Sequence, residues 1–199
     1  MCIRDRADTR KKLDEYFYRV VQSMISSLEA KDPYTRGHSD RVSAYAKKIA
    51  VGLGLPQEKI ELLGEAVQLH DIGKLGIHED LLNKSGALSD SEWDVVHKHP
   101  VAGEEILKPV FLDPEMLSVI RSHHERFDGS GYPDGLKGDK INIFAQITSI
   151  ADAYDAMTSS RSYRPALSKA EAMRRLQKDS GTQFNPQVVD AFIKILEKE

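Results

Sequence analysis

The chain has 199 residues, a length that suits one compact domain, and its 40% hydrophobic and 30% charged residues are ordinary for a globular protein. Its formal net charge of -3 argues against a broad nucleic-acid-binding surface, which needs a basic face, but leaves a small anionic substrate open because bound metal ions can supply positive charge. The single cysteine, Cys2, permits no internal disulfide and favours a cytoplasmic location, and no apolar run is long enough to span a bilayer.

The first predicted element is a helix within residues 1–30, where apolar side chains from Leu13 to Leu28 recur at helical spacing. One interpretation is a helix that faces the core of the domain. The other is a signalling helix that continues from an upstream sensory or receiver domain and pairs with its copy in a homodimer. We expect residues 1–30 to be such a linker and residues 31–199 to form the domain itself.

Helical signals continue along the chain. Apolar residues three and four apart predict a helix around Val42–Ile49, and a further apolar segment predicts one over Ile60–Leu69. Capping signals that predict further helix starts are Ser89 with Glu92, Asp113 with Pro114, Ser168 with Glu171, and Asn185 with Pro186. No segment alternates with period two for long enough to indicate a strand, so we predict one all-α domain of roughly seven to nine helices.

A histidine and an aspartate, His70 and Asp71, follow the helix over Ile60–Leu69. We expect this helix to end at Gly73, in the left-handed position that glycine tolerates. Asp71 is poorly placed there, because a negative charge is unfavourable at the C-terminus of a helix. Either solvent screens this helix end, or a cation such as a metal ion offsets the cost.

Two aspartates, Asp152 and Asp155, lie three residues apart in a later predicted helix. Their like charges therefore meet on one helical face, which costs a few tenths of a kcal/mol. One interpretation is that both side chains are exposed to solvent. The alternatives are a bound metal ion or a cationic partner such as Arg161 or Arg164.

Two adjacent histidines, His123 and His124, end the helix that begins at Asp113 and precede a glycine-rich segment over residues 125–140. Imidazoles that both point inward are costly unless they bind something, and neutral imidazole is a common metal ligand. A long loop in a compact domain is usually functional or disordered. Together with the other histidines and carboxylates near helix ends, the pattern favours a binuclear centre, in which two cations clamp the oxygens of a phosphoryl displacement.

Five segments occur in the order DPYTRGHSDRV, LHDIGKLGI, HKHPVAGEEIL, HHERFDGSGYPDGLKG and IADAYDAMTSSRSYR. In this combination they closely resemble the HD-GYP domains of bacterial signalling proteins, the cyclic di-GMP phosphodiesterases of the HD metal-dependent phosphohydrolase superfamily. The HHE…GYP segment is the most specific part of the match. The resemblance implies an all-α, compact multi-helix bundle with a binuclear metal centre and a glycine-rich GYP loop.

The resemblance also implies roles for individual residues. Asp71 would bridge two divalent transition-metal ions, Fe or Mn, and Lys74 would lie beside the scissile phosphate as the second catalytic residue. The other implied metal ligands are His38, His70 and Asp152 for one ion and His99, His123 and His124 for the other. The implied substrate-binding residues are Gly131, Tyr132 and Pro133 on the loop, with Arg161 and Arg164 on the phosphates. His78 and His97 match no ligand position and are interpreted as spectators.

The activity that the resemblance implies is hydrolysis of cyclic di-GMP to linear pGpG, with onward cleavage to GMP left open. One alternative is a catalytically silent sensor or docking module for a cyclic dinucleotide. The intact set of ligands, together with Lys74, argues against it. Another alternative is an HD-type phosphohydrolase that acts on a different nucleotide, including mixed cyclic GMP-AMP. None of these readings involves polymeric nucleic acid.

The chain departs from the common family residues at three places. His78-Glu79 stands where Pro-Asp is usual, Gln146 where Arg is usual, and Asn185 where Asp is usual. No departure removes a ligand, but the first two raise the question of loop geometry and stability. In addition, Tyr34 stands where some members carry a glutamate that helps to bind a third metal. Since a phenol is a poor ligand at neutral pH, we expect two metals and a reaction that largely stops at pGpG.

Overall fold

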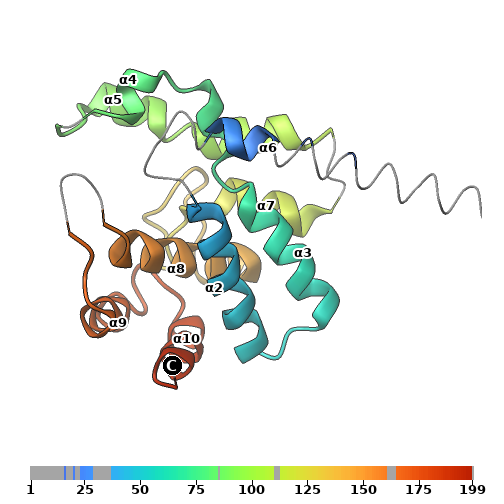
Figure 1. Ribbon diagram of the computed structural model, residues 1–199, viewed down its shortest axis with the longest axis vertical. Helices are drawn as coiled ribbons and strands as arrows, with labels where there is room; N and C mark the ends of the chain where they lie inside the picture. The colour runs from blue at the N-terminus through green and yellow to red at the C-terminus, as the bar shows by residue number, and fades with distance from the viewer. Residues whose placement is uncertain are drawn as a thin grey trace, which may run out of the picture.

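The protein is described by a computed structural model, which is all-helical across the residues it describes, as predicted from the sequence (Figure 1). The described residues are 16, 20, 23–28, 37–84, 86–109, 113–160 and 165–198. In this part of the chain the only β-type pairing is an isolated bridge between Ser180 and Phe184. None of the described helices combines the length and the apolar character needed to cross a membrane.

The named helices follow one another without an intervening strand in the described segments. The α-helices are α2 (His38–Gly52), α3 (Gln57–Gln68), α4 (Glu79–Leu82), α5 (Asp90–Val96), α6 (His99–Leu107), α7 (Pro114–Ser122), α8 (Ile143–Thr158), α9 (Lys169–Lys178) and α10 (Pro186–Leu196). Two short 3-10 helices, η1 (Ile72–Gly76) and η2 (Gly138–Lys140), complete the set. The predicted caps at Ser89, Asp113, Ser168 and Asn185 all bond to backbone amides at their helix starts.

Helix α8 is the central element of the core. It packs against α2, α7, α9 and α10, which surround it in Figure 1. Its apolar face is closed to solvent, with Phe144, Ile147 and Ile150 at most 1% exposed. Burial of each such side chain contributes about 1.5–3 kcal/mol to stability. The core therefore holds α8 rigidly, and with it any polar side chain that α8 carries on its remaining faces.

The N-terminal segment only partly follows the predicted pattern. Residues 23–28 are helical, and Ile25 and Leu28 are buried at 7% and 4% exposure. Val20 and Met24, which were expected on the same face as Leu28, are instead exposed. Leu13 lies outside the described residues. The buried face of this segment is thus set by Ile25 and Leu28, because these two side chains reach the domain.

Helix α3 ends earlier than predicted. Its last residue is Gln68, and Gly73 lies in η1 and is not among the glycines with positive φ. The requirement for glycine here has a different cause. A Cβ atom at Gly73 would lie 1.9 Å from the carbonyl oxygen of His99 and 2.6 Å from the backbone nitrogen of Gly103. The missing side chain lets η1 pack directly on the start of α6, which brings Asp71 next to His99.

The glycine-rich segment is folded around one buried carboxylate. Glu125 is 2% exposed and accepts hydrogen bonds from the backbone amides of Asp134 (2.7 Å) and Leu136 (3.0 Å). Gly131 packs so closely on this turn that a Cβ there would lie 2.3 Å from the backbone nitrogen of Arg126. Of the two outcomes considered for this loop, order or disorder, the structure has the ordered one.

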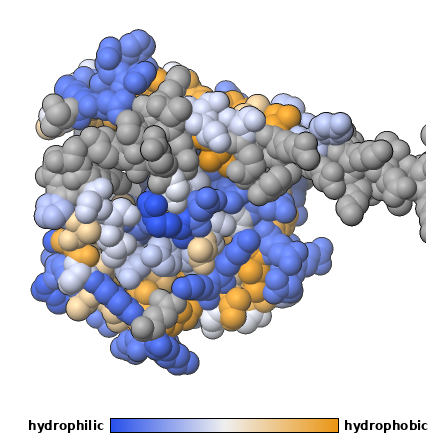
Figure 2. All heavy atoms as spheres, viewed as in Figure 1, coloured by the Kyte–Doolittle hydropathy of each residue, from blue (hydrophilic) through white to orange (hydrophobic). Residues whose placement is uncertain are grey.

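Helices α4 and α5 lie at the edge of the fold and bury no residue. Hydrophilic side chains cover this region in Figure 2, at the upper left. His78 accepts a hydrogen bond from the amide of Asp80 (3.4 Å) and so caps α4. The departure at His78-Glu79 therefore supplies a helix cap on the surface and leaves the core unchanged.

Gln146 and Asn185, the other two residues that differ from the common family residues, are in direct contact. Asn185 donates a hydrogen bond to the side-chain oxygen of Gln146 (2.5 Å), and both residues are buried. Gln146 in turn donates to the carbonyl oxygens of Ile141 (2.7 Å) and Gly138 (3.2 Å), at the end of the glycine-rich loop. A neutral amide pair therefore links this loop to the start of α10, where an Arg and an Asp are usual.

This pairing predicts a coupled effect on stability. Asn185→Asp alone should destabilise the fold by about 1–3 kcal/mol, because it buries a carboxylate that faces an amide. Gln146→Arg in the same chain should recover much of that loss by supplying a cation. Urea unfolding of both single variants and the double variant gives the coupling free energy as a double-mutant cycle. Strict additivity of the two changes would contradict the pairing.

Candidate metal centre

The seven side chains predicted to bind metal meet at one place, although they come from five different parts of the chain. His38 begins α2, and His70 and Asp71 follow α3. The N-terminus of α6, the C-terminus of α7 and the middle of α8 supply the rest, namely His99, His123, His124 and Asp152. The ends of four helices and one face of α8 therefore converge on a common point.

Two groups of candidate ligands share the carboxylate of Asp71. One group is Asp71 with His99, His123 and His124, and the other is Asp71 with His38 and His70. In each group one ligand atom per residue lies within 4.8 Å of the others. Asp152 lies at the edge of the second group, with its Oδ1 3.3 Å from Nε2 of His38. A shared carboxylate between two sets of imidazoles is the donor arrangement of a binuclear centre.

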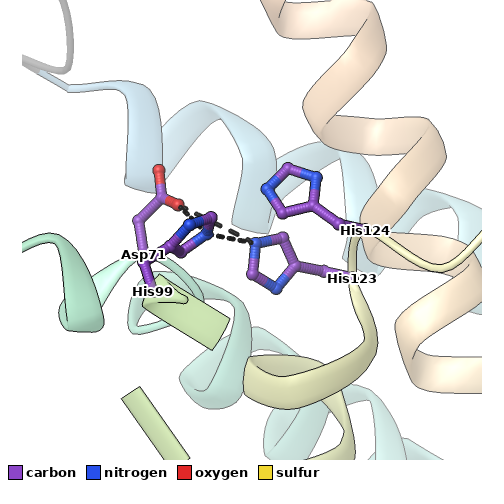
Figure 3. Close-up of side chains that lie close together, drawn as sticks. All are labelled: Asp71, His99, His123 and His124. Carbon is purple, nitrogen blue, oxygen red and sulfur yellow. Dashed lines mark hydrogen bonds and ion pairs between the residues drawn. The ribbon is translucent and has the colours of Figure 1, made fainter. Parts of the chain in front are cut away.

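Figure 3 shows how the first group is arranged. The Nε2 atoms of His99 and His123 face each other at 3.3 Å, and Asp71 Oδ1 lies 3.4 Å and 3.8 Å from them respectively. The ring of His124 lies beside that of His123, with centroids 4.1 Å apart. The three imidazoles and the carboxylate thus surround a small common space.

Three of the histidines are oriented in the same way, by a hydrogen bond from Nδ1 to a backbone carbonyl oxygen. The last turn of a helix leaves carbonyl oxygens without a partner in the helix, and the histidine that follows donates its Nδ1 proton to the carbonyl three residues earlier. The distances are 2.7 Å from His70 to Val67, 2.7 Å from His99 to Val96 and 2.9 Å from His123 to Ile120. Since a carbonyl only accepts, each Nδ1 carries the proton and each Nε2 presents a lone pair to the centre.

Lone pairs that face one another need a cation between them. His99 Nε2 and His123 Nε2 cannot both accept without one, and His70 Nε2 and Asp71 Oδ1 are buried with no hydrogen-bond partner among the described residues. A buried polar atom left unpaired costs about 1–3 kcal/mol. The residues present therefore fit a pair of transition-metal ions, for which mixed imidazole and carboxylate ligands are suited.

The electrostatics of the group agree with this fit. Burial lowers the pKa of His70 and of His123, and it lowers the pKa of His124 to about 3, so these imidazoles stay neutral as ligands must. Burial also tends to lower the pKa of His38, but hydrogen bonds to two aspartates on α8 outweigh it and raise the pKa to about 10. His38 thus lies where a positive charge is favoured.

The ammonium of Lys74 lies beside the shared carboxylate. Lys74 Nζ donates to Asp71 Oδ2 from one turn along η1. Burial would raise the pKa of Asp71, but Lys74 and the nearby imidazole of His70 hold it well below its usual value. Asp71 is therefore ionised, and the charged end of Lys74 lies next to the candidate metal ligands.

Asp155 has a partner that the sequence did not reveal. It is 2% exposed, so solvent exposure, one of the interpretations left open for this aspartate, does not apply to it. It accepts hydrogen bonds from His38 Nδ1 (2.8 Å) and, in a two-point contact, from Arg41 Nε (2.7 Å) and Nη2 (3.1 Å). Asp155 thus orients the candidate ligand His38 and is itself held by Arg41, one turn along α2. His38 and Arg41 are three residues apart and therefore share one face of α2. This spacing is the feature of the sequence that could have identified Arg41 as the partner of Asp155.

His97, interpreted as a spectator, stacks on the GYP loop. The ring of Tyr132 lies between those of His97 and His124, with centroids 4.1 Å and 4.8 Å away and planes inclined by 29° and 23°. Trp93 follows on the outer side, 5.3 Å from His97. The stack connects α5 to the candidate ligand His124 through Tyr132.

The remaining predicted site residues divide into two sets. Gly131 and Tyr132 line a groove beside His123 and His124, and Pro133 follows Tyr132 through a cis peptide bond. Arg161, Arg164 and Tyr34 lie outside the described residues.

Comparisons with known proteins place this geometry in context. The family model described as HD domain matches residues 22–188. The chain is 41% identical over 172 residues to a cyclic di-GMP phosphodiesterase of Pseudomonas aeruginosa, covering 84% of this chain and 40% of that protein. It is 36% identical over 183 residues to 3'3'-cGAMP-specific phosphodiesterase 3 of Vibrio cholerae, covering 92% and 40%. The chain thus spans two fifths of the length of these two relatives.

Among solved structures, the chain is similar to an HDG"Y"P protein of Bdellovibrio bacteriovorus. The TM-score is 0.66 and the sequence identity 26%, and the match covers 80% of this chain and 51% of that chain.

The stacked rings predict that His97 positions the ligand His124. His97→Ala should weaken metal binding about tenfold, the lower end of the effect of removing a residue that orients a ligand. His97→Phe should retain the affinity, because a flat ring still covers Tyr132. Competition with a chelator measures the affinity, and His78→Ala, a histidine exposed on the surface, is the matched control. Equal behaviour of the Ala and Phe variants would contradict the positioning role.

Proposed function

Because this chain belongs to the HD domain family, we propose that it is a metal-dependent phosphodiesterase that hydrolyses a cyclic dinucleotide, with cyclic di-GMP as the preferred substrate. The relatives and the solved HDG"Y"P neighbour agree with the HD-GYP resemblance recognised in the sequence. The observation that carries the proposal is the buried carboxylate of Asp71, which is ionised and shared by two groups of imidazoles.

The ligand roles follow from this arrangement as part of the proposal. His38, His70 and Asp152 would hold one metal ion, His99, His123 and His124 the other, and Asp71 both. Mixed nitrogen and oxygen ligands suit Fe, Mn or Zn, and the resemblance to HD-GYP domains favours Fe or Mn among them. When bound, such a pair supplies Lewis-acid activation of water and stabilises charge on the phosphoryl oxygens. Asp155 and the three backbone carbonyls keep the imidazoles aimed at the centre, so that little reorganisation is needed.

Lys74 has the second role in the proposed reaction. Its ammonium adjoins Asp71, within the same polar cluster as the candidate ligands. From there it donates a hydrogen bond to a phosphoryl oxygen, or a proton to the leaving oxygen, and so stabilises the charge that develops as the phosphodiester opens. Arg161 and Arg164 are proposed to hold the phosphates of the substrate through paired hydrogen bonds.

A second substrate is supported by a specific observation. One relative is named as a 3'3'-cGAMP-specific phosphodiesterase, at 36% identity. Mixed cyclic GMP-AMP therefore belongs in the same assays as cyclic di-GMP. A catalytically silent docking module is disfavoured, because the full set of candidate ligands and Lys74 lie together.

The wider context of the enzyme is also proposed. This chain covers 40% of each of the two relatives, so both have further segments. In the full protein, we propose an upstream sensory or receiver domain. Residues 1–30 would link that domain to the enzyme, and a homodimer through this helix is the arrangement that we propose. The cytoplasm is the location favoured by the single cysteine.

The first test separates metal binding from chemistry. Protein loaded anaerobically with Fe or Mn should bind about two ions per chain and open cyclic di-GMP. Lys74→Ala should keep both ions and lose about a hundredfold in turnover, whereas Asp71→Ala should lose metal and activity together. Metal analysis and chromatography of the products measure both effects, with Lys178→Ala on α9 as the control. A Lys74→Ala enzyme with the wild-type rate would exclude this role for Lys74.

The second test concerns the extent of hydrolysis. With tyrosine at position 34, a third metal ion lacks the carboxylate that some HD-GYP members provide, so the wild type should accumulate linear pGpG and cleave it to GMP slowly. Tyr34→Glu should gain bound metal and speed the second step. A time course of pGpG and GMP formation by both enzymes measures the rate of the second step. Rapid formation of GMP by the wild type would refute the assignment.

A further inference from the structure

A groove of about 380 Å³ opens beside the candidate metal ligands on the side of the GYP loop. His124 and Asp152 form the wall nearest the centre. Arg126 from the loop, Ser149 from α8 and Gln183 from the turn before α10 also line it. The volume is within the range of sites that bind small molecules. A phosphodiester placed at the candidate metal ligands would therefore have this groove next to it for one of its nucleosides.

The groove offers hydrogen-bonding groups that the protein does not use. Neither the side-chain amide of Gln183 nor the hydroxyl of Ser149 has a partner among the residues that the structure describes. Arg126 bonds to Ser130 through Nε (2.9 Å) and to Asp128 through Nη2 (3.2 Å), which holds its guanidinium in place. An amide, a hydroxyl and the rest of a fixed guanidinium thus remain for a ligand.

The charges in the groove favour a neutral ligand over a second phosphate. The positive charge of Arg126 is balanced by Asp128, and Asp152 adds a negative charge at the inner wall. The ring of Tyr132 is covered on one face by His97 and on the other by His124, so it is not free to stack on a base. A nucleobase in this groove would be recognised by hydrogen bonds along its edge.

We propose that this groove is the subsite for a guanine base of the cyclic dinucleotide, an inference that rests on the proposed function. Arg126 donates to the adjacent acceptors O6 and N7 of guanine, the commonest contact between arginine and a base. Gln183 and Ser149 bond to the remaining polar atoms. Adenine presents an amino donor beside N7, which faces the donors of Arg126 unfavourably. The groove therefore selects guanine.

Gln183 is the cleanest residue for the test, because removal of its side chain breaks no hydrogen bond within the described structure. Gln183→Ala in the metal-loaded full chain should raise KM for cyclic di-GMP about tenfold, the expected loss for one base contact. Hydrolysis of bis(p-nitrophenyl) phosphate, which has no base, should not change. Gln187→Ala, an exposed glutamine at the start of α10, is the matched control.

A second variant tests the choice of base. The wild type should prefer cyclic di-GMP to cyclic di-AMP in kcat/KM, and Arg126→Met should reduce that ratio about tenfold. Because this change also removes the bonds to Ser130 and Asp128, the ratio is the readout and not the absolute rate.

These experiments distinguish a failure of the guanine subsite from a failure of the proposed phosphodiesterase activity. Unchanged KM in Gln183→Ala, or an equal loss on bis(p-nitrophenyl) phosphate, would overturn the subsite and leave the phosphodiesterase intact. An unchanged base preference in Arg126→Met would likewise overturn the assignment of that residue. A wild type that cleaves bis(p-nitrophenyl) phosphate but no cyclic dinucleotide would defeat the proposed function, and the guanine subsite with it.

Discussion

The arrangement of the site depends on one buried carboxylate. Asp71 is 6% exposed and lies among imidazoles from three other elements, and one of its oxygens has no hydrogen-bond partner in the part of the chain that the structure describes. An unpaired charge at such a depth is strongly unfavourable. Lys74 compensates part of it, and the lone pairs that point at the same space leave room for cations. A fold that tolerates this cost in its interior is organised around what binds there.

Two features of the backbone make the convergence possible. The absence of a side chain at Gly73 lets η1 approach the start of α6, and carbonyl oxygens at the ends of α3, α5 and α7 each accept the Nδ1 proton of a following histidine. Each of these hydrogen bonds provides a donor for a carbonyl oxygen at a helix end, and it also sets the tautomer of a candidate ligand. These bonds also explain why so many of the candidate ligands lie immediately after helices.

The surroundings of the centre are held by contacts between distant elements. Asp155 holds His38 from 117 residues away in the sequence and is itself held by Arg41, and Gln146 and Asn185 join the end of the GYP loop to α10. His97 and His124 enclose Tyr132. A groove that Gln183 lines opens beside the centre, so the packing that orients the candidate ligands also shapes the groove proposed to bind the substrate.

Much of this protein was determined by local sequence. The apolar spacing of α2, the caps at Ser89, Asp113 and Asn185, and the all-helical class follow from interactions within a few residues, which a sequence displays directly. The candidate ligands were identified through motifs. Their convergence, the end of α3 at Gln68 and the partners of Asp155, Tyr132 and Gln146 were decided by tertiary structure alone. Each depends on which residues from remote segments meet at close range, and periodicity and capping carry no information about such pairs.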